Sequence, residues 1–187
     1  GKRVIEAKSG FGNTVSVTPR DGFPTLNVYF FSGSHRKGSV ADSLKTLCEE
    51  KGLGLRICEV DIHVGGSDHD LLGRDAQEHW ITRIAAGDFH FVVSSPPCNS
   101  WSRCQDANTQ KPRPGRSRQH PWGKPGLLSG DRKRANDGNT FVLFAIRAIT
   151  AIAGAKRRGL YVRSLLEHPE DLGATPLGVP ASIWQLK

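Results

Sequence analysis

The chain alternates short runs of β-branched and aromatic residues with longer stretches in which apolar positions recur at helical spacing. Leu26–Phe31, Leu55–Val60 and a run that begins at Phe89 have the composition of buried strands. Between them, Val40–Glu50 and Asp75–Ala86 each place apolar residues on one helical face. This order of strand, helix, strand, helix and strand predicts a parallel sheet with right-handed crossovers.

The pattern continues in the second half of the chain. Gly138–Arg158 has the clearest helical periodicity, ends in cationic residues where the helix dipole favours them, and is followed by Gly159. Leu160–Leu166 then predicts another strand. We therefore expect an α/β fold with a mostly parallel sheet and helices on both faces. Residues 1–24 predict a loose arm, residues 25–175 a core and residues 176–187 a tail.

One strand is followed at once by a potential nucleophile. The run from Phe89 stops at Pro96-Pro97, and Cys98 comes next. Proline lacks the amide donor that a sheet needs, so Cys98 is expected at the carboxyl end of a strand, where ligands of open α/β sheets bind. An unpaired cysteine is also often a small buried residue without a chemical role. The local sequence leaves both interpretations open.

The first two strands predict a second kind of site. A turn that contains Gly33 and Gly38 joins the first strand to a helix, which can bring backbone amides and a helix N-terminus close to a polar cofactor. The second strand ends in Glu59-Val60-Asp61, near the interval at which a carboxylate binds ribose hydroxyls in such folds. These acids could equally be solvated groups at a strand end.

Composition narrows the class of protein. The 187 residues suit one domain, and we expect neither a secretory signal nor a membrane span. A net charge of +8 favours a polyanionic partner, with nucleic acid first. Four irregularly spaced cysteines predict neither a disulfide framework nor a zinc site, and they indicate an intracellular protein. The absence of methionine suggests a processed chain or a piece of a longer one.

Residues 102–136 have a different character. They are strongly basic and interrupted by proline and glycine, and Trp101 and Trp122 add flat apolar surfaces. Such a loop could bind a phosphate backbone, or it could be a solvated surface loop. The candidate nucleic-acid contacts are Arg103, Lys111, Arg113, Arg116 and Arg118.

Five segments, in this order, resemble motifs of the cytosine-5 DNA methyltransferase family. They are Phe31-Ser32-Gly33, Glu59-Val60-Asp61, Asp70-Leu71, Pro97-Cys98-Asn99-Ser100-Trp101-Ser102 and Glu167-His168-Pro169. The segments SPPCNSWSR and LLEHPEDLG are especially similar to segments of methylase-like open reading frames of dinoflagellates. Three features depart from the family: Tyr29 stands where an acid is common, the turn after the first strand carries a bulky SHRK insert, and His168-Pro169 replaces Asn-Val.

The resemblance implies a Rossmann-like methyltransferase core without a target-recognition domain, which a further domain or subunit would have to supply. It implies that Cys98, after Pro97, adds to cytosine as a thiolate and that Glu167 stabilises the ring. S-adenosylmethionine would bind at Phe31, Ser32, Gly33, Glu59, Asp61, Asp70 and Leu71. The partner would be DNA rather than RNA, with the target base flipped out, and the location nuclear if the source is a eukaryote.

Two other interpretations stay open. One is a non-catalytic relative that keeps the fold and uses its basic loop to bind nucleic acid. The other is a flavodoxin-like FMN-binding reductase, because GSHRKGS resembles a phosphate loop in which Ser34, Arg36 and Ser39 hold the FMN phosphate.

Overall fold

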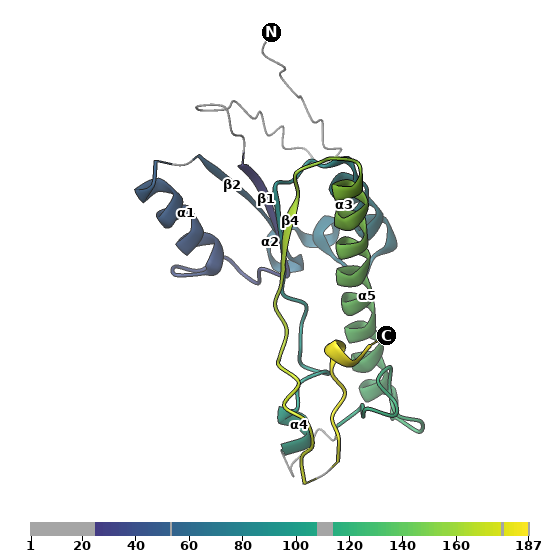
Figure 1. The fold of residues 1–187 in the computed structure, drawn as a ribbon. Coiled ribbons are helices and arrows are strands. Elements are labelled where there is room, and N and C mark those ends of the chain that lie inside the picture. The colour runs from purple at the N-terminus through teal and green to yellow at the C-terminus, as the bar shows by residue number, and fades with distance from the viewer. Residues whose placement is uncertain (1–24, 53, 108–113, 177, 187) are drawn as a thin grey trace.

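The structure is a computed structural model that describes residues 25–52, 54–107, 114–176 and 178–186 (Figure 1). The predicted arm, residues 1–24, lies outside the described residues.

Four strands form one parallel sheet in the order β2-β1-β3-β4. They are β1 (Thr25–Phe30), β2 (Leu55–Val60), β3 (Phe91–Ser94) and β4 (Arg163–Leu166). Phe30 pairs with Val60 on one side and with Ser94 on the other, and Ser94 pairs with Leu166. The carboxyl ends of all four strands therefore lie level at one edge, which we call the carboxyl edge. The predicted α/β fold with a parallel sheet is confirmed.

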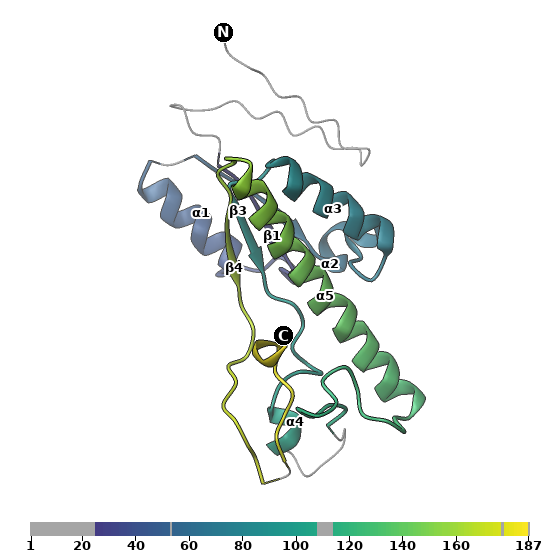
Figure 2. The same cartoon turned by 45° about the vertical axis from the view of Figure 1, so that its right-hand side comes forward.

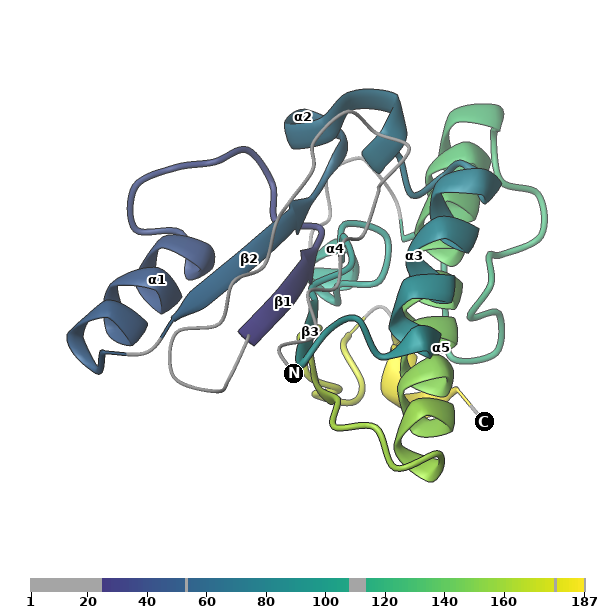
Figure 3. The ribbon, with the colours of Figure 1, turned by 90° about the horizontal axis from the view of Figure 1, so that it is seen from above.

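Helices cover the two faces of the sheet unequally. α1 (Val40–Glu50) lies over one face beside β2, and α3 (Arg74–Ala86) and α5 (Ser129–Arg157) pack together on the other (Figure 3). Phe30 points into this second layer, where its ring meets Trp80 of α3 edge-on at 5.7 Å and Phe144 of α5 at 5.0 Å. Burying a side chain of this size stabilises the fold by about 1.5–3 kcal/mol, so this layer holds the main core.

Helix α5 begins nine residues earlier than the predicted start at Gly138. The N-terminal extension is supported by ion pairs from Lys133 to Asp137 at 2.6 Å and from Arg134 to Asp131 at 3.0 Å. Gly138 lies inside the helix, where a Cβ would collide with the hydroxyl of Ser100. The basic segment 102–136 is therefore partly helix. By length and composition alone α5 could cross a membrane, but a core helix passes the same test, so this argues neither way.

The N-terminal half of α5 extends past the sheet (Figure 2). The loop after β3 and the end of the chain pack against it, and Trp101, Val142 and Ala181 form a second buried cluster. The remaining elements are short: α2 (Ile62–Gly65), the 3-10 helix η1 (Gly66–His69), α4 (Cys104–Ala107) and the 3-10 helix η2 (Ile183–Gln185).

Candidate functional site at the carboxyl edge

The backbone after β3 places Cys98 at the carboxyl edge, as the sequence predicted. The amide of Ser95 donates to the Phe30 carbonyl at 3.3 Å, so pairing continues one residue beyond the strand and stops at the prolines. The Cys98 carbonyl then accepts the amides of Trp101 at 2.9 Å and Ser102 at 2.8 Å. The thiol is free and half-buried, and it stands on a closed turn rather than on an open loop.

Glu167 reaches the same edge from β4. Its backbone amide donates to the Ser94 carbonyl at 2.9 Å, so Glu167 lies directly beside the end of the strand that leads to Cys98. Its side chain is exposed and makes no hydrogen bond or ion pair with any residue that the structure describes. The structure therefore brings Cys98 and Glu167, 69 positions apart, to one edge of one sheet.

His168 anchors the segment that follows β4. Its side chain is 8% exposed, and its ring meets Trp101 edge-on at 6.5 Å. Neither ring nitrogen has a hydrogen-bond partner of good geometry among the described residues. Burial lowers the pKa of His168 to about 4, and the nearby Pro169 backbone offsets only part of this shift. A neutral, buried imidazole therefore holds the chain next to Glu167.

The turn after β1 is strained. Phe31 has a φ of 62°, the only positive value at a non-glycine position among the described residues. Its ring packs on Phe141 of α5 at 5.2 Å, and its amide donates to the Val60 carbonyl at 2.8 Å. Such a backbone costs about 1–3 kcal/mol and is common at ligand sites. At Gly33 no described atom lies within 4 Å of the position that a Cβ would take, so space adjoins the turn.

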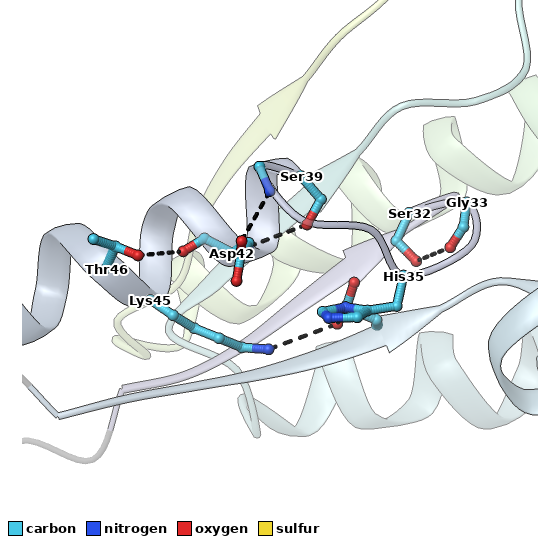
Figure 4. Close-up of polar contacts among 9 residues, drawn as sticks. Ser32, Gly33, His35, Ser39, Asp42, Lys45 and Thr46 are labelled. Carbon is cyan, nitrogen blue, oxygen red and sulfur yellow. Dashed lines mark hydrogen bonds and ion pairs between the residues drawn. The ribbon is translucent and has the colours of Figure 1, made fainter.

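The two acids after β2 already have internal partners. One oxygen of Asp61 accepts the amide of Gly33 and the other accepts the amide of His63, both at 3.0 Å. The Glu59 side chain is 12% exposed, and one of its oxygens lies 3.5 Å from His35 Nδ1 and 3.7 Å from Lys45 Nζ. Figure 4 shows His35 and Lys45 converging from the turn and from α1. Asp61 therefore links the turn to the end of β2, and Lys45 of α1 offsets the negative charge of Glu59.

Asp70 and Leu71 separate in the structure. Asp70 is half-buried and accepts the amide of Leu72 at 3.0 Å with one carboxylate oxygen. Leu71 is 3% exposed and belongs to the main core, and its carbonyl accepts from Gln77 at 2.8 Å. Asp70 can face a ligand. The side chain of Leu71, which the sequence placed among the cofactor-binding residues, is occupied in the core.

The basic candidates after Cys98 also have different environments. Arg103 is half-buried and donates to the Leu172 carbonyl at 3.0 Å, and Arg118 is exposed. Lys111 and Arg113 lie outside the described residues.

Arg116 is 2% exposed, which corrects its assignment to the nucleic-acid surface. Its guanidinium stacks on the Trp101 ring at 4.0 Å and donates five hydrogen bonds, to both oxygens of Ser100, to the carbonyls of Pro121 and Ala135 and to Asn139 Oδ1. Burial lowers its pKa to about 10. Arg116 therefore ties the Cys98 turn to α5.

The sequence did not indicate the ion-pairing roles of His35 and Lys45, and it marked His168 only as a departure from a motif, not as a buried residue. Each acquires its role through a contact between elements that are distant in the chain, and no local pattern marks such a contact. Within the described ranges, no group of His, Cys, Asp and Glu could hold a metal ion.

No protein-family model, no curated protein and no solved structure matches this chain.

Proposed function

We propose that this chain is an S-adenosylmethionine-dependent methyltransferase-like domain that methylates carbon 5 of cytosine in DNA through Cys98. The observation that supports the proposal best is the pairing of β3 with β4, which puts a free thiol and an unpartnered carboxylate at one carboxyl edge. That edge is where open α/β sheets bind their ligands.

The chemistry requires these two groups. Carbon 5 of cytosine is a poor nucleophile until sulfur adds to carbon 6, and Cys98 would form that bond. Glu167 would hydrogen-bond ring nitrogen 3 and stabilise the charge that develops on the ring. The methyl donor, when bound, supplies an electrophilic methyl group. Transfer of the carbon-5 proton to water and departure of the Cys98 sulfur as a thiolate would then restore the ring. The closed turn at Cys98 and the buried His168 would hold the two groups in place.

The residues after β1 and β2 fit a nucleoside donor in part. Gly33 adjoins open space, and Asp70 keeps one carboxylate oxygen without a hydrogen-bond partner among the described residues, so both could face the donor. Glu59 could accept the ribose hydroxyls only by exchanging His35 and Lys45 for them. The two interactions are long, and the His35 and Lys45 side chains are both partly exposed, so water can replace Glu59 as their partner. The ribose hydroxyls would then donate to the Glu59 carboxylate.

The flavodoxin-like alternative has one observation in its favour. The order β2-β1-β3-β4 is the beginning of the flavodoxin strand order, although a Rossmann sheet without its outermost strand shows the same neighbours. The loop before α1 argues against FMN. The Asp42 carboxylate accepts the Gly38 amide at 2.8 Å, and Ser39 caps the helix through the Asp42 amide at 3.2 Å (Figure 4). An acid thus stands where a phosphate would have to bind.

Calorimetric titration with S-adenosylhomocysteine and, separately, with FMN tests the proposal. We expect S-adenosylhomocysteine to bind, Glu59→Gln to weaken it about tenfold through the loss of one charge-assisted hydrogen bond, and FMN to give no heat. Glu49→Gln, an exposed change on α1, is the matched control. Binding of FMN alone would support the flavodoxin-like alternative and would contradict the proposal.

A further inference from the structure

Two hollows flank Arg118 on the side of the molecule formed by the loop after α4 and the end of the chain. The first has a volume of about 610 Å³ and is lined by residues 117–120, Lys124, Pro125, Gly178 and Val179. The second has a volume of about 580 Å³ and is lined by Arg118, Pro121, Trp184, Gln185 and Leu186. Arg118 lines both hollows, so they adjoin at this residue.

The first hollow carries unpaired positive charge on a fixed loop. The Arg118 amide donates to the Val179 carbonyl at 3.0 Å and the Lys124 amide to the Gly115 carbonyl at 2.8 Å. The side-chain nitrogens of Arg118 and Lys124 make no hydrogen bond and no ion pair within 4 Å with any residue that the structure describes. His120, which is exposed, adds an imidazole to the same hollow. The backbone is held while the charges stay available.

Asp171 and Asp106 are the acids whose charges act on these cations. Asp171 is fully exposed, and it accepts from Gln185 at 2.8 Å and from Gly173 at 3.1 Å. These hydrogen bonds, more than the charges of Arg118 and Arg103, lower the pKa of Asp171. Asp106 is buried, and desolvation raises its pKa against the opposing charge of Lys124. Neither acid forms an ion pair within 4 Å with Arg118 or Lys124, the described cations of the hollow.

The second hollow offers a fixed aromatic surface. Trp184 is 51% exposed, although a tryptophan this large is usually well buried. Its indole nitrogen donates to the Pro169 carbonyl at 2.9 Å, and its amide donates to the hydroxyl of Ser182 at 3.3 Å. The ring is therefore oriented but uncovered, which is the arrangement on which an unpaired base stacks.

We propose that the two hollows form a binding site for single-stranded nucleic acid. Arg118, His120 and Lys124 contact successive phosphates, and Trp184 stacks on one base. The site is joined to the reactive turn, because the same loop is tied by Arg116 to Ser100, two residues after Cys98. The choice of nucleic acid as the polyanion rests on the proposed function. A base already free of a duplex would need no flipping to reach Cys98.

Fluorescence anisotropy with a labelled 12-mer of single-stranded DNA, the same RNA and the DNA duplex tests this site. The variants are the double variant Arg118→Gln with Lys124→Gln, and the single variants Trp184→Ala and Trp184→Phe. The charge-matched control is the double variant Lys156→Gln with Arg157→Gln, at the C-terminal end of α5. We expect the double variant to lower the log–log salt slope by about 0.7 for each phosphate that the protein no longer binds. Trp184→Ala should weaken binding about tenfold, whereas Trp184→Phe should keep most of it.

Three results would overturn the site. They are equal affinity of Trp184→Ala and the wild type, an effect of the Lys156→Gln and Arg157→Gln control as large as that of the Arg118→Gln and Lys124→Gln variant, and tighter binding of the duplex than of either single strand. Comparison of the DNA and RNA affinities identifies which of the two nucleic acids the site prefers. All variants should retain S-adenosylhomocysteine binding, and Cys98→Ser should retain nucleic-acid binding. Loss of this site alone therefore leaves the proposed function standing, and failure of the donor titration alone leaves the site standing.

Discussion

The two halves of the carboxyl edge differ in how their polar side chains are used. At the ends of β1 and β2, Glu59 is paired with His35 and Lys45, and Asp61 holds two backbone amides. At the ends of β3 and β4, Cys98 and Glu167 have no such partner among the described residues, although the backbone around them is fixed. The acids at the ends of β1 and β2 are therefore held by protein partners without a ligand. At the ends of β3 and β4 the backbone is fixed, and the reactive side chains stay free to contact a ligand.

Removing the Arg116 side chain, which links the Cys98 turn to α5, should have the largest effect on stability. Arg116→Met leaves several buried oxygens without a donor, and we expect it to lower the free energy of unfolding by about 3 kcal/mol or more. Arg118→Met, two positions away and exposed, should change it by less than about 0.5 kcal/mol. Urea denaturation of both variants measures the difference. Equal stability would show that the Arg116 network does not hold the turn.

The end of β4 should be sensitive to acid. The pKa of His168 is about 4 in the folded chain and near 6.5 in the unfolded chain, so the unfolded chain binds more protons between these values. His168 therefore leaves the free energy of unfolding unchanged above about pH 6.5 and lowers it by about 2–3 kcal/mol as the pH falls toward 4.

Urea denaturation midpoints measured at pH 7.5, 5.5 and 4.5 report this loss of stability. Burial also lowers the pKa of His69 and His79, which add dependence of the same sign. The test is therefore the difference between the wild type and His168→Leu, which should be flatter. Parallel curves for the two proteins would contradict the buried, neutral histidine.

At the end of β2, losing the Asp61 carboxylate should destabilise the fold more than losing the Glu59 carboxylate. Asp61→Ala removes the acceptor of two backbone amides, and we expect it to cost about 2 kcal/mol. Glu59→Ala breaks only two long ion pairs, whose partners His35 and Lys45 are both partly exposed, and should cost less than about 1 kcal/mol. Thermal unfolding by circular dichroism compares them. The reverse order would mean that Glu59, not Asp61, fastens this half.

The sequence predicted the order of strands and helices because alternation and helical spacing are local properties of the chain. It also placed Cys98 and Glu167 at the carboxyl edge, since parallel strands that end in proline leave few other arrangements. It misplaced the start of α5, because the prolines and glycines of residues 102–136 indicated irregular structure up to the end of that segment, whereas α5 begins at Ser129. Gly138 lies inside the helix, where its small size serves a close approach to Ser100.

Charge and burial were the properties that the sequence could not assign. Arg116 and Arg118 stand in the same basic stretch, yet one is buried against Trp101 and the other lines two hollows. Leu71 matched a motif next to an acid and proved to be a core residue. In each case the deciding neighbour comes from a distant element, so only the folded chain reveals it.

The proposed methylation depends on the Cys98 thiol acting from the carboxyl edge, and covalent trapping tests this most directly. Oligonucleotides that contain 5-fluorocytosine, single-stranded and duplex, are incubated with the chain and S-adenosylmethionine and resolved under denaturing conditions. We expect a stable protein–oligonucleotide adduct with the wild type and with Cys104→Ser, and none with Cys98→Ser. An adduct that survives in Cys98→Ser, or no adduct with the wild type, would contradict the account.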